Sequence, residues 1–153
     1  MKDVDLRSRM SPTLPCVVGV VLGVVCGWVW PWRIGLTRYV LPSGVFLGVL
    51  VALLTASLLH SFKRHRTSSD PRREVTAIVD TGLYRFSRNP GYVGAGAVQV
   101  VVGLLLNNAW IVLMVIPAMV VIHRWVVLGE EAHLEAKFGE EYLKYKARVR
   151  RWI

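Results

Sequence analysis

The chain has 153 residues, the length of a single domain, and 54% of them are hydrophobic. These residues lie in long blocks rather than at even spacing, which excludes an ordinary soluble domain and is typical of a membrane protein. The formal net charge of +9 does not indicate a nucleic-acid partner, because the cationic residues flank the apolar blocks, where the positive-inside rule and anionic lipids account for them.

The first apolar run predicts a membrane-spanning helix over residues 14–32, long enough for a hydrocarbon core of about 30 Å. A basic start followed by an apolar run also occurs in signal peptides. This run is too long for one, and three tryptophans follow it where a small-residue cleavage site would stand. Its two cysteines, Cys16 and Cys26, form no metal-ligand or disulfide pattern and are expected to be packing residues.

A second apolar run predicts another spanning helix over residues 41–62, without a charged residue before His60. A strongly basic connector follows between residues 63 and 73, and a turn is predicted at 67–71. The short apolar stretch 75–79 is too brief to cross a membrane and leads into a polar segment.

That polar segment, residues 81–94, is rich in turn-forming and cationic residues. Its glycines and proline interrupt regular structure or allow a close approach to the backbone. Its arginines supply fixed positive charge, and its tyrosines supply flat faces with a polar tip. These residues are Gly82, Tyr84, Arg85, Arg88, Pro90, Gly91, Tyr92 and Gly94. The small residues at 94–97 open a span, where we expect them to permit close helix packing.

The third apolar run, from about residue 92 to residue 128, is too long for one helix across a bilayer. Asn107 and Asn108 stand near its middle, and two amides suit a turn better than a lipid environment. The sequence therefore predicts a helical hairpin, with arms over residues 90–106 and 109–129.

The tail from Glu130 onward has the pattern of an amphipathic helix. Apolar residues recur at spacings of three and four: Leu134, Phe138, Tyr142, Tyr145, Val149 and Trp152. Basic residues occupy the other faces: Lys137, Lys144, Lys146, Arg148, Arg150 and Arg151. Gly139 interrupts the pattern and predicts a kink or break. Such a helix lies on the membrane surface or packs against the cytosolic side of the protein.

Together these elements predict an all-α integral membrane protein with four transmembrane helices, the last two forming a hairpin, and a C-terminal amphipathic cytosolic helix. The single domain, 1–153, combines two spans and a basic connector (1–74) with the polar segment, hairpin and tail (75–153). The positive charges place both termini on the cytosolic side of a plasma or inner membrane. The polar segment and the pair Glu130-Glu131 then lie on the same side, close enough to form one pocket.

Four residues near the end of the last span have two interpretations each. Glu130 and Glu131 either open the tail helix, where carboxylates are favoured, or turn a carboxylate into a polar crevice to bind a cation or hydroxyl groups. His123 is seven positions from Glu130 and shares its helix face; it is either a hydrogen-bonded structural residue or part of the site. Arg124 is either a cytosolic-side snorkelling residue or a ligand of an anionic substrate group.

Three ordered blocks of this sequence resemble the isoprenylcysteine carboxyl methyltransferase family, part of a wider group of integral-membrane methyltransferases that includes phospholipid methyltransferases. The first block is Gly82-Leu83-Tyr84-Arg85 with Arg88-Asn89-Pro90-Gly91-Tyr92-Val93-Gly94. The second is Glu130-Glu131, and the third is Phe138-Gly139-Glu140-Glu141-Tyr142-Leu143-Lys144-Tyr145 with Val149. The resemblance covers about residues 75 to 153.

The resemblance implies S-adenosylmethionine as the cofactor, bound on the cytosolic side, and a lipophilic or lipidated methyl acceptor drawn from the membrane. It implies catalytic roles for Glu130, Arg124 and Arg88, and no metal site. The implied cofactor-binding residues are Thr76, Ala77, Ile78, Val79, Tyr84, Asn89, Pro90, Gly91, Tyr92, His123, Glu130 and Glu131.

Two positions depart from the family pattern. Asn89 stands where the eukaryotic members usually have histidine, and Val126 stands where they have a substrate-binding arginine. The acceptor is therefore open among an isoprenylcysteine-like carboxylate, a small thiol, a phospholipid amine and another lipid. Two other classes remain: a small four-span transporter or scaffold, and a membrane reductase of sterol-like lipids. The first two spans carry no acid or base for ion coupling, which argues against the transporter.

Overall fold

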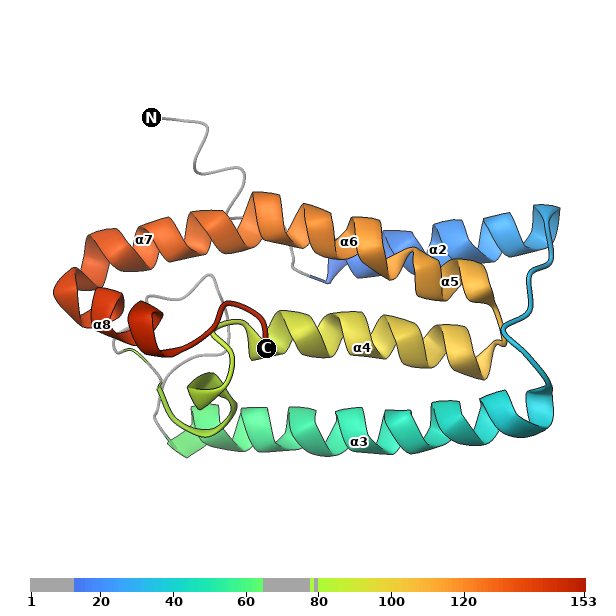
Figure 1. Cartoon of the computed structure of the whole chain (residues 1–153), viewed down its shortest axis with the longest axis horizontal. Coiled ribbons are helices and arrows are strands. Elements are labelled where there is room, and N and C mark those ends of the chain that lie inside the picture. The colour runs from blue at the N-terminus through green and yellow to red at the C-terminus, as the bar shows by residue number, and fades with distance from the viewer. Residues whose placement is uncertain (1–12, 65–77, 79) are drawn as a thin grey trace.

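The computed structural model describes residues 13–64, 78 and 80–153, and its regular structure in these residues is all helical. Three long helices are α2 (Leu14–Val29), α3 (Thr37–Arg64) and α4 (Pro90–Leu105). They lie alongside one another and along a fourth rod, which is built from consecutive helical segments (Figure 1). The apolar runs therefore form helices as predicted, although α2 ends before the predicted residue 32 and α3 begins before the predicted residue 41.

The fourth rod runs through α5 (Ala109–Leu113), α6 (Val115–Ile122), the π-helical turn η2 (His123–Val127) and α7 (Leu128–Phe138). The prediction that this arm ends at residue 129 is wrong, because the helix continues past Gly129 with helical geometry. Glu130 and Glu131 consequently project from the first turn of α7 rather than from a new helix.

Two helices of the described residues are long and apolar enough to cross a membrane: Thr37–His60 and the rod Ala109–Phe138. The other apolar helices, α2 and α4, have 16 residues each. At 1.5 Å per residue such a helix is about 24 Å long, which is shorter than a hydrocarbon core of about 30 Å. Length and composition thus support two membrane-crossing helices; the four-span arrangement stays a prediction.

Helix α4 is central, since it contacts α3 on one side and α2, α5 and α6 on the other. Glycines allow close approaches between the helices of this bundle. A Cβ atom at Gly23 of α2 would lie 2.6 Å from Ile111 Cα, and one at Gly103 of α4 would lie 2.5 Å from Val112 Cγ2. At the same crossing the buried Gln99 amide donates a 3.1 Å hydrogen bond to the Ile111 carbonyl oxygen.

The predicted turn at Asn107 and Asn108 is confirmed. Asn107 adopts a φ of +48°, which asparagine tolerates better than most residues. Its side chain bonds the α2–α3 loop, accepting from Ile34 N and donating to the Gly35 carbonyl oxygen. Asn108 is the N-cap of α5 and accepts from the Trp110 backbone N–H at 2.9 Å. The turn thereby ties the hairpin to the first two helices.

The tail breaks at Gly139 as predicted, with φ +53° and ψ −124°. Helix α8 (Glu140–Arg148) then folds back beside α7 (Figure 1). The prediction of a helix through Trp152 is wrong beyond Arg148, because Val149 is extended with φ −115° and ψ 132°. Helix α8 packs against other parts of the chain, and its location on the cytosolic side stays a prediction. Its buried apolar residues join others in one cluster: Ile78, Leu134, Phe138, Tyr142, Tyr145 and Val149.

Candidate functional site

The polar segment forms a compact loop at one end of the helix bundle. It begins with Gly82 at φ +61°, passes through the 3₁₀ turn η1 (Gly82–Arg85) and ends at Asn89, the residue before α4. Pro90 occupies the first turn of α4, where the missing N–H has no intrahelical partner to lose. Tyr92 therefore lies in the first turn of α4, directly after the polar loop.

Tyr92 meets Glu130 across the hairpin. The tyrosine hydroxyl donates a 2.7 Å hydrogen bond to Glu130 Oε1. Within the described residues Glu130 has no ion-pair partner, in contrast to its neighbour Glu131. Tyr84 lies close by: burial and the charge of Glu130 raise the pKa of Tyr84 to about 12. Two of the predicted cofactor residues, Tyr84 and Tyr92, are therefore brought near a third, Glu130.

Glu131 points into a separate ionic cluster, which we call the arginine clamp and which consists of Glu131, Arg88 and Arg151. Arg151 holds the carboxylate with two hydrogen bonds, Nε to Oε1 at 3.0 Å and Nη2 to Oε2 at 2.8 Å. Arg88 Nη1 lies 3.2 Å from Oε1. The side chains of Glu131 and Arg88 are only 7% and 9% exposed, whereas that of Arg151 is 33% exposed. The hydrogen bonds to Glu131 raise the pKa of Arg151.

The segment that follows α8 completes the clamp by pairing with the polar loop. Ser87 and Arg150 form a parallel bridge, and the Arg88 backbone N–H donates to the Arg150 carbonyl oxygen at 2.9 Å. The Asn89 side-chain amide donates to the Arg151 carbonyl oxygen at 3.1 Å. Asn89 is buried and so serves as a tether between two chain segments. Sequence patterns assigned residues 149–152 to a helix face and gave no signal for this pairing.

Helix α8 also contacts the polar loop. The Tyr145 hydroxyl donates a 2.9 Å hydrogen bond to the Tyr84 carbonyl oxygen. Burial raises the pKa of both Tyr142 and Tyr145. Tyr142 and Tyr145 are nearly inaccessible to solvent, so the part of α8 next to the polar loop is closely packed.

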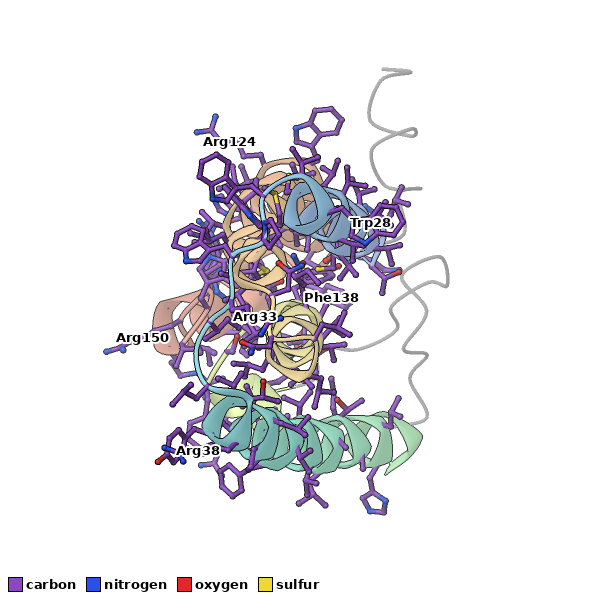
Figure 2. The ribbon with its side chains drawn as sticks, turned by 90° about the vertical axis from the view of Figure 1, so that its right-hand side faces the viewer. Trp28, Arg33, Arg38, Arg124, Phe138 and Arg150 are labelled. Carbon is purple, nitrogen blue, oxygen red and sulfur yellow. The ribbon has the colours of Figure 1, made fainter. Side chains whose placement is uncertain are left out.

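His123 and Arg124 begin the π-helical turn η2 and face different surroundings. The His123 ring lies 5.9 Å from the Trp152 ring, centroid to centroid, and its Nδ1 is buried without a hydrogen-bond partner in the described residues. Arg124 is exposed, and Figure 2 shows its side chain directed away from the helices. The structure therefore does not bring Arg124 to Glu130, and Val126 is buried in the core.

The remaining predicted cofactor residues are Thr76 to Val79 and Gly91, and two further glycines of α4, Gly94 and Gly96, lie near Gly91 in the sequence. Thr76, Ala77 and Val79 lie outside the described residues; Ile78 packs against the tyrosines of α8. Gly91 leaves its surroundings open, because a Cβ atom there would meet nothing nearer than Leu58 at 4.0 Å. Gly94 has nothing within 4 Å of such an atom, whereas Gly96 packs near Met119 Sδ at 3.1 Å. Close packing explains Gly96 but not Gly91 or Gly94.

Comparison with known proteins identifies one family. The phospholipid methyltransferase family matches residues 38–141, more than half of the chain, including the polar loop, the hairpin and both acids. An uncharacterized protein of Haemophilus influenzae is 46% identical over 50 residues, which cover 33% of this chain and 79% of that protein. No solved structure matches the chain. With the apolar helices and the family match together, the chain belongs to the phospholipid methyltransferase family and is a membrane methyltransferase.

Proposed function

We propose that the protein transfers a methyl group from S-adenosylmethionine to the headgroup amine of a membrane phospholipid. The observation that carries this proposal is the Glu130 carboxylate, held by Tyr92 and without a cation of its own among residues 13–64, 78 and 80–153. A partly buried carboxylate is costly unless a cation or further donors meet it. The sulfonium and ammonium groups of the cofactor are suitable cations.

The residues around Glu130 fit such a cofactor. The Tyr92 hydroxyl fixes one carboxylate oxygen and leaves the other for a ligand. Open space beside Gly91 and Gly94 allows a ligand to approach the backbone of α4. When bound, S-adenosylmethionine supplies an electrophilic methyl group on a positively charged sulfur atom. Glu130 and Tyr92 bind the ammonium group of the cofactor and thereby orient the neighbouring sulfonium group toward the acceptor.

Charge favours an amine over a carboxylate as the acceptor. An acceptor carboxylate at the position of the transferred methyl group would bring two negative groups together at Glu130, where the exposed Arg124 is not placed to compensate them, and the guanidinium groups of Arg88 and Arg151 are paired with Glu131 instead. A neutral amine creates no such repulsion. The amine is an ammonium group at neutral pH and must lose a proton before it can attack the methyl group. His123, whose buried Nδ1 has no hydrogen-bond partner in the described residues, is the candidate acceptor of that proton. The family match supports a phospholipid as the carrier of the amine.

We also propose that α2, α3, α4 and the rod α5–α7 all cross the membrane, and that the site lies on the cytosolic side. Helix α7, which carries Glu130, and helix α8 lie at the bundle end at which α3 ends (Figure 1). In the sequence, the basic connector 63–73 follows at the end of α3. Positive residues of short loops are retained on the cytosolic side. The cofactor then enters from the cytosol, and the lipid enters sideways from the bilayer. The family match disfavours the transporter and reductase alternatives.

The test is methyl transfer by purified protein in vesicles, with S-adenosylmethionine labelled in its methyl group. Parallel vesicles contain phosphatidylethanolamine, phosphatidylglycerol, or phosphatidylglycerol with a prenylated cysteine. We expect label in the ethanolamine lipid and a loss of at least about tenfold in the Glu130→Gln variant. Label in the prenylcysteine instead would refute the amine acceptor, and label in none of the three would refute the proposed reaction.

A further inference from the structure

Two of the three guanidinium nitrogens of Arg88 lack a hydrogen-bond partner in the described residues, although the Tyr142 side chain also lies beside this guanidinium group. The Arg88 side chain is 9% exposed, and the two nitrogens are Nε and Nη1. The 3.2 Å contact of Nη1 with Glu131 Oε1 is an ion pair that is not aligned as a hydrogen bond. Buried guanidinium N–H groups are normally satisfied, because leaving them unpaired is costly. These donors therefore indicate a missing acceptor.

The charge of the arginine clamp indicates an anionic acceptor. Two guanidinium groups, Arg88 and Arg151, share the single carboxylate of Glu131, which leaves one positive charge in excess. Arg151 forms the rim of the clamp and is one-third exposed, so a ligand has a route to the cluster from that side. Guanidinium groups bind carboxylates and phosphates through paired N–H donors.

We propose that Arg88, with Arg151 at the rim, is an oxyanion subsite that binds a carboxylate or phosphate group of a ligand whose cationic part lies at Glu130. Glu130 and Glu131 are adjacent but face opposite kinds of partner, Tyr92 in one case and two arginines in the other. The site consequently has a negative pole beside a positive one. These two poles match a zwitterionic ligand. Which zwitterions are candidates depends on the proposed function.

Two ligands of that reaction carry an oxyanion near a cation. The cofactor has a carboxylate beside its ammonium group, and phosphatidylethanolamine has a phosphate beside its amine. The chemistry at Arg88 is the same in both cases, so the experiment must separate the two sources. It uses one change in the ligand and one in the protein, because only a direct contact makes the two changes non-additive.

In the cofactor arm, titration calorimetry in detergent compares S-adenosylhomocysteine with 5′-deoxy-5′-(3-aminopropylthio)adenosine, the same molecule without its carboxylate. If Arg88 binds this carboxylate, its removal weakens binding about 10- to 100-fold in the wild type and less than about threefold in Arg88→Lys. In the lipid arm, kcat/KM is compared for phosphatidylethanolamine and a diacyl lipid amine that lacks the phosphate. If loss of the phosphate lowers kcat/KM strongly in the wild type and only slightly in Arg88→Lys, the phosphate is the group that Arg88 binds.

Lysine keeps a positive charge beside Glu131, so Arg88→Lys is expected to fold; a melting curve checks this, and Arg151→Lys gives a second variant at the rim. Arg148→Lys is the matched control, since Arg148 pairs with Asp80 at the surface with side chains 67% and 50% exposed. Non-additivity in either arm supports the subsite. Equal ligand preferences in wild type and variants in both arms would overturn it. If the wild type binds neither adenosine compound and transfers no methyl group, the proposed function fails first, and the subsite with it.

Discussion

The Tyr92 hydroxyl lies 2.7 Å from Glu130 Oε1, although 38 positions separate the two residues in the sequence. The turn at Asn107 and Asn108 makes this contact possible, because it reverses the chain between α4 and the rod that carries Glu130. Each arm of the hairpin supplies one partner, so the register of the two arms places the hydroxyl at the carboxylate. With the same register, the Glu131 side chain points toward Arg88 and Arg151, the two arginines of the arginine clamp.

Removing the Tyr92 hydroxyl should weaken cofactor binding while the fold is kept. In Tyr92→Phe the Glu130 carboxylate loses its orienting hydrogen bond, and a hydrogen bond to a charged group contributes about 1.5–3 kcal/mol. We expect the Kd of S-adenosylhomocysteine to rise by about tenfold or more, measured by titration calorimetry. Tyr39→Phe is the control, because Tyr39 is an exposed residue on α3. Equal affinities of the two variants would show that the hydroxyl does not act at the site.

Glu131→Gln should destabilise the protein strongly. The substitution leaves Arg88 buried without a counter-charge, and losing one partner of a buried ion pair costs about 3–5 kcal/mol. The measurement is the free energy of unfolding in detergent. Glu135→Gln provides the comparison, since Glu135 pairs with Lys146 where both side chains are about one-third exposed; its expected cost is about 0–1 kcal/mol. Similar costs for the two variants would contradict a structural role for the clamp.

Gly139→Ala should disturb the fold at the α7–α8 junction. Gly139 has φ +53° and ψ −124°, a conformation that residues with a Cβ atom rarely adopt, and the expected cost is about 1–3 kcal/mol. At Gly129, which is helical and has open space around it, alanine is expected to stabilise the protein by about 0.5–1 kcal/mol. The melting temperatures of both variants test these two expectations. A higher melting temperature for Gly139→Ala, or a lower one for Gly129→Ala, would contradict the described geometry of the α7–α8 junction.

Asn108→Ala should lower stability without changing cofactor affinity. Its side chain caps α5 at the Trp110 and Ile111 backbone N–H groups, and loss of such a cap costs about 1 kcal/mol. Asn108 precedes α5, and the start of α5 lies at the end of the bundle opposite α8 (Figure 1). Unfolding and S-adenosylhomocysteine titrations are measured on the same preparation. The control is Ser43→Ala, because the Ser43 hydroxyl donates to the Tyr39 carbonyl oxygen one turn earlier in the same helix. A large change in affinity at Asn108 would place the site elsewhere.

Local patterns predicted the parts of the fold that depend on local physics. Apolar runs gave the helices, two adjacent amides gave the hairpin turn, and Gly139 gave the break in the tail. These features follow from the intrinsic preferences of a few neighbouring residues. The hairpin then brought Tyr92 to Glu130, because a reversal at a known position fixes which residues of the two arms face each other.

Long-range pairing was not predictable in the same way. The spacing of Val149 and Trp152 fits a helix, but the chain leaves the helix at Arg148 to pair with the polar loop. That pairing supplies Arg151 to Glu131, and nothing near Arg151 in the sequence encodes a partner 20 positions away. Likewise, spacing alone could not decide whether Arg124 faces the site or the surroundings of the bundle. The roles of the predicted site residues stay proposals that binding experiments must test.

The most direct measurement is the affinity of S-adenosylhomocysteine for purified protein in detergent, compared between wild type and Glu130→Gln by titration calorimetry. Glutamine keeps the shape of the side chain and a hydrogen bond with Tyr92 but removes the negative charge. We predict saturable binding by the wild type and at least about a tenfold higher Kd for the variant, with unchanged melting temperatures. Equal affinities, or no binding by well-folded wild-type protein, would contradict a cofactor site at Glu130.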